Sequence, residues 1–406
     1  VAVAWVATLA GRRLARRAEV SSAAAGDAPP GVAAAEEEKA AFLKALQQHM
    51  RGAVTMKMLF LGDRLGLYKV MAARRAGSKT AASQWTAASL AKATGGLQAR
   101  FVQEWLAQQA AAEILDFDPA SGTFSLRAAR TPVLADDLSG SFFAAYATLV
   151  YSLFARLPSV VKAFKGDCQG VSYDEAGDEV ADAMARLHVP EFRFKLLPNV
   201  LPRVLDGRLV AMLEAGGRCA DMGCCGMDCT IELARAFPKA TFDGYDVAEP
   251  ALERAAANIE RSGMANLAVH DARTRPISAG PPGAAGAKFD FVICYDVLHD
   301  VPDPESLMRD VRKALSPDGV WLVVDITTHG DHATNIAQHA GAATYYGISV
   351  CLCLASGLSA PGGRGLGTLG FTIDVATEMF QRCGFSRVKA YRMPGLEKNT
   401  CFEVQI

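Results

Sequence analysis

The chain has 406 residues, of which 50% are apolar and 21% are charged, and its formal net charge is −1. This length allows two domains with separate hydrophobic cores. A balanced charge gives no general attraction to DNA, RNA or an anionic membrane, so composition does not predict these partners. The ten cysteines are scattered through apolar segments. Such spacing excludes a dense disulfide scaffold and favours reduced thiols.

The first 44 residues do not have the pattern of a folded domain. Residues 1–26 are rich in alanine and arginine and nearly free of acids, which is typical of the end of an organelle transit peptide. The apolar run Val1–Ala10 leaves a truncated secretory signal as the alternative. Residues 27–41 read as a linker that runs into a helix. We therefore expect residues 1–44 to be a targeting remnant and linker, and the protein to lie inside a plastid or mitochondrion, or otherwise in the cytoplasm.

Residues 45–135 have the element order of a winged helix. Apolar residues recur at helical spacing over Met58–Met71. Thr86 can cap a helix that ends at Ala93, and Gly95-Gly96 forms the turn before a second helix with Trp105. ILDFDPASGTFSL then reads as a hairpin. Helix, turn, helix and hairpin predict an α+β winged-helix domain.

The charge of the second helix of this domain argues against DNA binding. A recognition helix needs cations for phosphates and polar side chains for base edges, but here Arg100 is accompanied by little more than Gln98, Gln103 and Glu104. Dimerisation is the favoured role. The apolar helix at Met58–Met71 and the ring of Trp105 exceed what one small domain should bury, so the sequence predicts a homodimer through this domain.

Residues 136–205 read as a helical connector. Its most apolar stretch, Phe142–Leu157, is shorter than the ~20 residues that a bilayer requires. A buried helix is therefore expected, and no membrane span. The glycines of FKGDCQGVSYDE, residues 164–175, indicate a loop beside a pocket.

Residues 206–406 alternate short apolar strands with helical segments. The predicted strands are RCADMG, ATFDGYD, LAVHDA, FDFVICYD and GVWLVVDI. This alternation is the signature of a doubly wound parallel sheet, so the fold class is α/β in this part of the chain.

Acidic residues end three of these strands in succession. Ligands of such sheets lie at the carboxyl ends of the strands, where the strand order reverses. Asp221 and Gly223 close the first strand, and Asp246 ends the second, where it can accept from both hydroxyls of a ribose. Asp271 ends the third strand, where it can accept from an adenine amino group. A single aspartate after a strand is a common turn former, but the ordered set predicts a nucleoside site.

At these residues the chain resembles the class I S-adenosylmethionine-dependent methyltransferases that have an N-terminal winged helix, from about Gly52 to the C-terminus. The resemblance is carried by GDRLGLYKVMA, RFVQEWL, AFPKATFDGYD, DVLHDVPDP, LSPDGVWLVVDI and GLGTLGF. It implies a Rossmann-like, mostly parallel sheet with an antiparallel C-terminal hairpin. It also implies S-adenosylmethionine as the cofactor, with contacts at Asp221, Gly223, Cys225, Asp246, Val247, Asp271, Ala272 and Tyr295.

The loop DMGCCGMDCT departs from the D-x-G-x-G-x-G pattern of the family, because Cys225 and Met227 stand where the second and third glycines are usual. A side chain at a position that needs φ > 0 costs on the order of 1–3 kcal/mol, or roughly one to two decades in affinity. Met227 either turns away from the cofactor or blocks its methionine end. SVCLCLASGL and GLGTLGFT also depart from the family at pocket-wall positions, which affects substrate binding.

Four cysteines crowd this loop, but their spacing does not favour a metal. Zinc knuckles pair cysteines as Cys-x-x-Cys, whereas these four spread over a strand, a turn and a helix start: Cys219, Cys224, Cys225 and Cys229. We expect small buried residues here and no metal.

His299, just beyond the fourth strand, is the candidate catalytic residue. Methyl transfer to oxygen needs a base that removes the hydroxyl proton, and histidine suits that role. Similar methyltransferases with a winged helix carry a Leu-His-Asp at this place. A helix-capping or core histidine is the alternative.

Together these patterns predict a methyltransferase that moves a methyl group from S-adenosylmethionine to a small-molecule acceptor, at oxygen. Residues 206–406 would form the cofactor-binding domain. The alternative is a catalytically inactive methyltransferase-like subunit with a structural or assembly role, and a transcriptional regulator ranks below both. The sequence does not identify the acceptor.

Overall fold

The computed structural model describes residues 30–76, 84–283 and 286–406. The chain divides into two compact units, Val1–Met56 and Lys57–Ile406. The described residues of the first unit all belong to helix α2 (Pro30–Arg64), which continues into the second. The linker expected up to residue 44 is thus helical from Pro30 on, because its alanines, glutamates and lysine are strong helix formers. The expected targeting remnant before Pro30 lies outside the described residues.

The winged helix is confirmed and opens the second unit. It consists of α3 (Leu67–Ala76), α4 (Ala87–Ala93), α5 (Ala99–Ala111) and the hairpin β1 (Asp116–Asp118) with β2 (Thr123–Ser125). Thr86 caps α4, since its hydroxyl accepts from the backbone of Ser89 while the Ser89 hydroxyl accepts from the backbone of Thr86. This reciprocal pair satisfies two amides that a helix start leaves without partners.

The helix expected over Met58–Met71 is in fact two helices. α2 ends at Arg64, Gly66 adopts φ +66°, and α3 begins at Leu67. Trp105 is not a docking surface either, because it is 5% exposed and its indole donates to the carbonyl of Met58 at 2.9 Å. The ring packs on Tyr68, with centroids 5.3 Å apart. This part of the argument for a dimer was therefore wrong.

The segment after the winged helix is helical, as its pattern indicates. Its elements are η1 (Ala128–Arg130), α6 (Thr131–Leu134), α7 (Ala145–Lys165), η2 (Tyr173–Ala176), α8 (Asp178–Glu191), the π-helix η3 (Phe192–Val200) and η4 (Leu201–Gly207). α7 buries Leu149, Leu153 and Val160. Within the described ranges, no helix has the length and apolarity needed to cross a bilayer.

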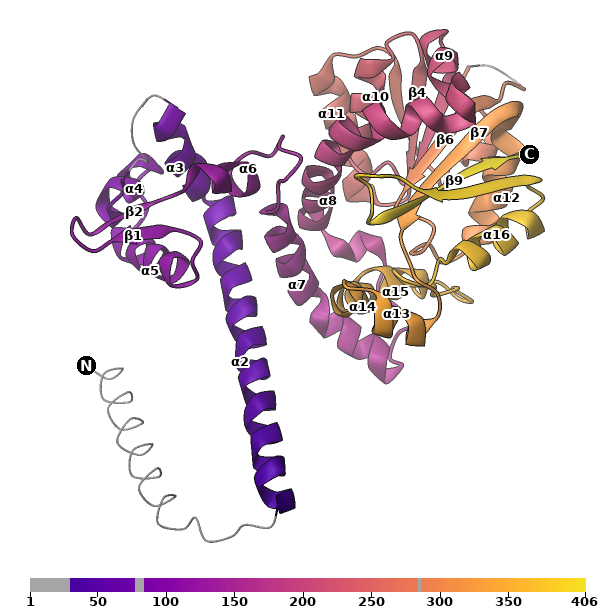
Figure 1. The fold of residues 1–406 in the computed structure, drawn as a ribbon. Coiled ribbons are helices and arrows are strands. Elements are labelled where there is room, and N and C mark those ends of the chain that lie inside the picture. The colour runs from indigo at the N-terminus through magenta and orange to yellow at the C-terminus, as the bar shows by residue number, and fades with distance from the viewer. Residues whose placement is uncertain (1–29, 77–83, 284–285) are drawn as a thin grey trace. The chain divides into compact units, whose positions relative to one another are not determined.

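Seven strands form the sheet of the C-terminal part, in the order β5-β4-β3-β6-β7-β9-β8 (Figure 1). Neighbours from β5 to β7 run parallel, whereas β9 is antiparallel to both β7 and β8. The predicted doubly wound sheet with an antiparallel hairpin is confirmed. The strands are β3 (Arg218–Met222), β4 (Thr241–Asp246), β5 (Leu267–Asp271), β6 (Phe289–Tyr295), β7 (Leu315–Ile326), β8 (Arg387–Arg392) and β9 (Asn399–Gln405).

Helices cover both faces of this sheet, and side chains alternate between two cores. In β6, Phe291 and Ile293 join the core beneath η3, η4, α9 (Arg208–Glu214) and α10 (Asp228–Ala236). Val292 and Cys294 join the core beneath α12 (Pro304–Ala314) and α16 (Ile373–Arg382). Because both faces are buried, β6 and the second half of β7 are largely apolar, which is typical of parallel strands.

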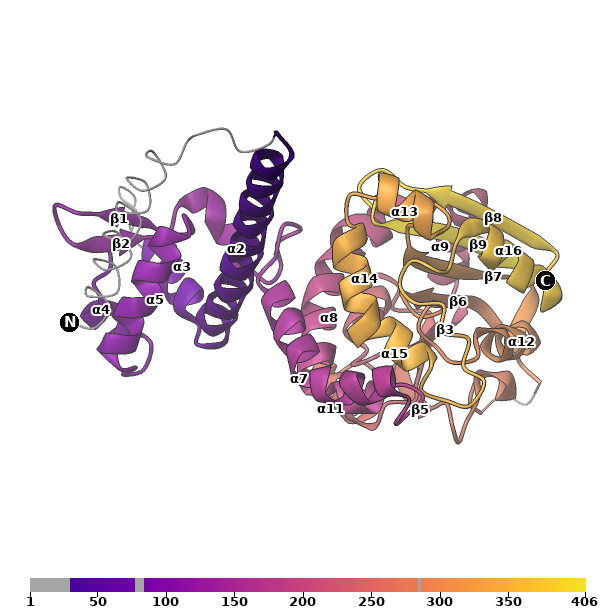
Figure 2. The same cartoon turned by 90° about the horizontal axis from the view of Figure 1, so that it is seen from below.

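The strand order reverses between β3 and β6, so a crevice opens at the carboxyl ends of these strands. Helices α13 (His332–Gln338), α14 (Ala342–Cys351) and α15 (Cys353–Gly357) follow β7. They lie at this end of the sheet (Figures 1 and 2). Loops after the strands and these short helices therefore build the surroundings of any ligand.

Candidate functional site

The loop between β3 and α10 adopts a left-handed backbone at three positions. Gly223 has φ +72°, Cys225 has φ +48° and Met227 has φ +57°. Glycine is required at the first, because a Cβ on Gly223 would lie 2.6 Å from Cγ2 of Val297. The other two positions carry side chains in a conformation that favours glycine, so the strain predicted from the sequence is present.

Met227 turns into the protein interior. Its side chain is fully buried in a small core with Cys224 and Ala255, beside Ile259 and Val269. Ala255 belongs to α11 (Glu249–Ser262). Of the two alternatives for Met227, the structure shows the one in which its bulk packs beneath α11.

Gly226, one position before Met227, provides a further close approach. A Cβ there would lie 2.6 Å from Oδ2 of Asp228 and 2.7 Å from Nε of Arg254. Arg254 of α11 pairs with Asp228 at 3.4 Å and with Asp182 of α8 at 3.3 Å. The loop is therefore packed under an arginine that two carboxylates hold in place.

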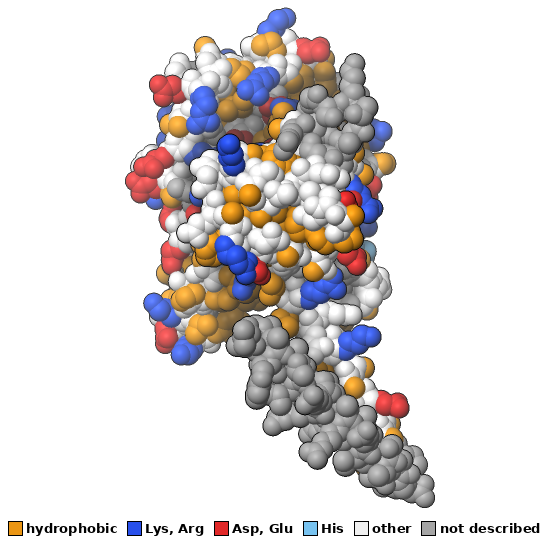
Figure 3. Space-filling view, turned by 90° about the vertical axis from the view of Figure 1, so that its left-hand side faces the viewer, with side chains coloured by type: hydrophobic (Ala, Val, Ile, Leu, Met, Phe, Trp, Pro, Cys, Tyr) orange, Lys and Arg blue, Asp and Glu red, His pale blue; other side chains and the backbone are white. Residues whose placement is uncertain are grey.

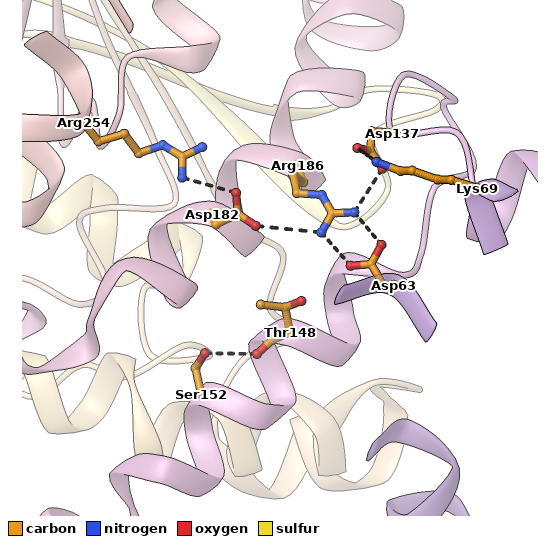
Figure 4. Close-up of polar contacts among 8 residues, drawn as sticks. All are labelled: Asp63, Lys69, Asp137, Thr148, Ser152, Asp182, Arg186 and Arg254. Atoms are coloured by element: carbon orange, nitrogen blue, oxygen red, sulfur yellow. Dashed lines mark hydrogen bonds and ion pairs between the residues drawn. The ribbon is translucent and has the colours of Figure 1, made fainter. Parts of the chain in front are cut away.

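The ion pairs of Arg254 continue into a network (Figure 4). Asp182 lies 3.8 Å from Arg186, whose guanidinium binds both oxygens of the buried Asp63 at 2.7 and 2.8 Å. Arg186 also donates to Asp137 at 3.0 Å. A bidentate, partly buried pair of this kind is stronger than an exposed one. The network thus links the start of α10 to α8 and to the end of α2.

The three strand-end aspartates differ in their surroundings. The carboxylate of Asp221 is buried and accepts from the hydroxyl of Thr230 in α10. This hydrogen bond joins the two ends of the loop. Burial raises the pKa of Asp221 to about 7, although the Thr230 hydrogen bond lowers it. Asp271 is partly exposed and pairs with Arg273 at 2.9 Å.

Asp246 connects the loop to the end of β4. One oxygen accepts from the backbone of Cys225 at 2.8 Å, and the other accepts from the amides of Val247 and Ala248 at 2.7 and 3.0 Å. The side chain is half-buried. Ala272, also half-buried, donates its amide to the carbonyl of Asp246. The predicted cofactor residues Asp246, Val247 and Ala272 are therefore brought together at one edge of the crevice.

A cavity lies next to this crevice, with about 710 Å³ of empty space that is partly open to solvent. Apolar and aromatic residues form much of its wall, among them Tyr146, Leu149, Met184, Tyr345 and Ile348. Apolar walls with a few convergent polar groups are typical of small-molecule sites.

His299 lies in the wall of this cavity and is held on both ring nitrogens. Nδ1 lies 2.6 Å from Oδ1 of Asp325, at the end of β7, and Nε2 lies 3.3 Å from Sγ of Cys353 in α15. The ring is 2% exposed. Burial lowers the pKa of His299, but Asp325 and Cys353 raise it more, so that it lies well above the ordinary value. The Asp325 carboxylate stabilises the imidazolium that forms when Nε2 of His299 accepts a proton.

Tyr295 is placed differently from the other predicted cofactor residues. Its ring belongs to the core beneath η3 and packs on His188 and Phe192. Its hydroxyl donates to Glu191 at 2.9 Å. A contact between this turn and a cofactor stays a prediction, and it would have to involve the backbone at the end of β6.

The sequence reasoning missed several residues of the cavity. Tyr173 of η2 lines it, and its hydroxyl bonds Asp300, whose pKa burial raises to about 7. The glycine-rich segment 164–175 did indicate a pocket at this place. Asp325 was also missed, although it ends a strand as Asp221 and Asp246 do. Cys353 belongs to SVCLCLASGL, the stretch expected at the pocket wall, but no role for its thiol followed from the sequence.

Comparisons with known proteins agree with this geometry. A family model described as a methyltransferase domain matches residues 220–321. A second, described as an Rv2258c-like winged HTH domain, matches residues 52–136. The first covers β4, β5 and β6, the loop, His299, and parts of β3 and β7.

Curated relatives match the methyltransferase part. The ubiquinone biosynthesis O-methyltransferase of Bordetella pertussis is 33% identical over 162 residues, which are 39% of this chain and 64% of that protein. Its counterpart from Neisseria meningitidis is 31% identical over 130 residues, 31% of this chain and 51% of the relative. The chain thus spans between half and two thirds of the length of these relatives.

Solved structures are similar over almost the whole chain. An O-methyltransferase family protein from Burkholderia thailandensis has a TM-score of 0.60 at 15% identity and covers 90% of this chain and 97% of its own. Human N-acetylserotonin methyltransferase, solved with S-adenosylmethionine, has a TM-score of 0.58 at 12% identity and covers 89% and 97%. The chain therefore has the class I methyltransferase fold, with a methyltransferase domain behind an N-terminal winged helix.

Proposed function

We propose that the protein transfers a methyl group from S-adenosylmethionine to an oxygen of a small, largely apolar acceptor. The observation that carries this proposal is the placement of His299, oriented by Asp325, in the wall of a cavity beside the glycine loop of a methyltransferase fold. The relatives named above as O-methyltransferases support oxygen as the accepting atom.

The residues at the crevice fit this cofactor. Gly223 makes the left-handed turn after β3 against Val297, Met227 packs into the interior, and the half-buried Asp246 places a carboxylate at the end of β4. Asp246 would accept from the ribose hydroxyls, and Asp271 with Ala272 would border the adenine. When bound, the cofactor would supply an electrophilic methyl group on a sulfonium.

The acceptor would enter the cavity, where apolar and aromatic walls exclude water from the reacting atoms. His299 would take the proton of the acceptor hydroxyl on Nε2 while Asp325 holds the ring by Nδ1. The thiol of Cys353 now occupies the contact with Nε2, so the acceptor has to displace it. The proton would pass to the imidazole, and the oxygen would take the methyl group while the S–CH₃ bond breaks and its electron pair stays on sulfur.

The first test is calorimetry with S-adenosylhomocysteine on the full chain. We expect binding to the wild type, and a loss of at least tenfold in affinity for Asp246→Ala. Asp318→Ala is the matched control, because Asp318 is an exposed residue of β7 far from the carboxyl end of that strand, and it should bind like the wild type. If millimolar ligand does not bind the wild type, the alternative of a catalytically inactive subunit takes its place.

We also propose a homodimer through the N-terminal part of the chain. Helix α2 exposes apolar side chains at spacings of three and four, Leu43, Leu46, Met50 and Val54, and Phe42 beside the first of them. A helix face of this kind is the usual surface for packing against another helix. Figure 3 shows hydrophobic side chains between scattered charges on one face of the molecule, and Phe101 and Phe117 of the winged helix are likewise exposed.

A further inference from the structure

We infer that Lys398, Tyr146 and Tyr345 form a carboxylate-binding clamp in the cavity wall, so that the methyl acceptor is an aromatic hydroxy acid. The inference rests on the proposed function and names the class of its substrate. All three residues line the cavity. Lys398 directly precedes β9, whereas Tyr146 belongs to α7 and Tyr345 to α14, so only the fold brings the three side chains to one cavity.

Lys398 provides the positive charge of the clamp. Its ammonium donates to the hydroxyl of Tyr146 at 3.1 Å and lies 5.4 Å from the centre of the same ring. Burial lowers the pKa of Lys398, but Tyr146 and Glu191 raise it more, so this pKa lies above its ordinary value. The ammonium therefore stays protonated beside the cavity, and its remaining N–H groups can donate to a ligand.

Among the described residues, no carboxylate forms an ion pair with this ammonium. Glu191 contributes to its raised pKa. However, Glu191 already pairs with Lys195 at 3.2 Å and accepts from the Tyr295 hydroxyl at 2.9 Å. The charge of Lys398 is thus not neutralised by a direct contact within the described parts of the chain, and a carboxylate on the acceptor would provide one.

The other carboxylates of the cavity wall already have partners inside the protein. Asp296 accepts from the amide of Asn399 at 2.7 Å and lies 3.4 Å from His188. Asp300 is bonded by the hydroxyl of Tyr173, and burial raises the pKa of Asp300 to about 7, so this acid is only partly charged near neutral pH. The cavity therefore favours an anionic group on the acceptor, placed beside the lysine ammonium.

Two phenols add hydrogen-bond donors to this charge. Because the oxygen of Tyr146 accepts from Lys398, its own hydroxyl proton is left to donate. Burial raises the pKa of Tyr345 and the Lys398 ammonium lowers it, which indicates that this phenol also lies near the ammonium. In the described part of the chain, neither of the two hydroxyls donates to an acceptor. An ammonium and two phenols suit one carboxylate, whose oxygens accept up to about four hydrogen bonds.

The base of the proposed reaction, His299, lies outside the clamp and contacts Asp325 and Cys353. A carboxylate is already ionised at neutral pH and needs no base, whereas transfer to a phenol requires removal of its proton. The acceptor hydroxyl would thus meet His299 while the clamp holds the carboxylate. Apolar side chains of the wall, such as Leu149 and Ile348, would contact the ring between the two groups. The product is then an aryl methyl ether that keeps its free carboxylate.

Calorimetry on the full chain saturated with S-adenosylhomocysteine tests the clamp. The probes are 3-hydroxybenzoate, 4-hydroxybenzoate and 4-hydroxycinnamate, each compared with its uncharged amide of nearly the same shape. We expect an acid to bind the wild type at least about fivefold more tightly than its amide, and Lys398→Met to remove this preference. Lys398→Arg should keep the preference, and Tyr146→Phe should reduce it. Lys313→Met is the matched control, because Lys313 is an exposed residue of α12 and does not line the cavity.

Equal affinity of every acid and its amide for the wild type overturns the clamp, as does a preference that persists in Lys398→Met. Absence of binding by all three acids overturns it as well. With S-adenosylmethionine and the preferred acid, mass spectrometry should find the methyl ether, and a methyl ester would overturn the assigned orientation.

Binding of S-adenosylhomocysteine alone, measured on the same samples, separates these results from the proposed function. If this ligand binds but the acids are not preferred, the clamp fails and the methyltransferase proposal stands. If the ligand does not bind the wild type, the methyltransferase proposal fails. A preference for the acids in the protein without that ligand, removed by Lys398→Met, would then support the clamp alone.

Discussion

The imidazole of His299 is fixed by Asp325 on one side and faces Cys353 on the other. Replacement by alanine removes the group that meets the acceptor, so we expect His299→Ala to lower turnover by ~10²–10⁴-fold while leaving cofactor affinity nearly unchanged. Single-turnover methyl transfer with an identified acceptor measures this. His332→Ala is the control, because His332 is exposed and bonds Tyr346 in α14. Full activity of His299→Ala would make the histidine structural.

Asp221 gives the stability of the protein a dependence on pH. Burial raises its folded-state pKa from 3.8 to about 7, so the neutral carboxyl is the form that the fold prefers. Its contribution is fully present below the unfolded pKa and is lost as the pH rises through about 7. We expect Asp221→Asn, which can still accept from Thr230, to gain stability relative to the wild type between pH 4 and pH 8. Urea unfolding at both values measures the difference, and an equal difference at both would contradict the assignment.

At the scale of the element, the loop before α10 carries side chains at two left-handed positions, Cys225 and Met227. Cys225 adopts φ +48° in the folded chain, so we expect its strain to lower the stability of the fold. We expect Cys225→Gly to raise the free energy of unfolding by about 1 kcal/mol and to change S-adenosylhomocysteine affinity less than threefold. The affinity loss expected from the sequence would then be small.

The control for Cys225→Gly is a glycine introduced where the backbone is helical and unstrained. Ala236→Gly at the end of α10 should lower the free energy of unfolding by about 1 kcal/mol. Chemical denaturation of both variants gives the two values. If Cys225→Gly destabilised the protein as much as Ala236→Gly does, the loop would carry no strain.

At the scale of the whole molecule, the exposed apolar face of α2 predicts self-association. Leu46 is 47% exposed and Met50 is 65% exposed. We expect a dimer by light scattering at micromolar concentration, and a monomer for Leu46→Glu/Met50→Glu, because charges on a packed helix face oppose association. Gln47→Glu adds charge beside this face and should remain dimeric. A monomeric wild type would refute the proposal.

Much of this architecture follows from local sequence patterns. The strand-ending aspartates Asp221, Asp246 and Asp271 mark one edge of the sheet because strand periodicity and turn chemistry are local, and Thr86 marks a helix start for the same reason. The site needed tertiary structure. Asp325 and Cys353 lie 26 and 54 residues beyond His299, and no local pattern brings such residues together.

Two further differences have physical causes that a pattern does not reveal. The break at Gly66 interrupts a run of residues with good helix spacing, because φ +66° ends the helix. The direction of Met227 depends on the space beneath α11, which only the packed structure defines. Sequence reasoning left both alternatives open for Met227 for that reason.

The cavity is complete only after strand β9 has been synthesised and has paired with β7. This strand inserts between β7 and β8, and its Asn399 donates to Asp296 at 2.7 Å beside the site. β9 is synthesised after β7, so β7 presents an open edge until β9 pairs with it. A nascent chain, or one shortened before β9, would thus expose the unpaired backbone groups of β7. It would also lack the cavity wall that Asn399 forms. We expect a chaperone that holds unfolded chains to bind at this edge.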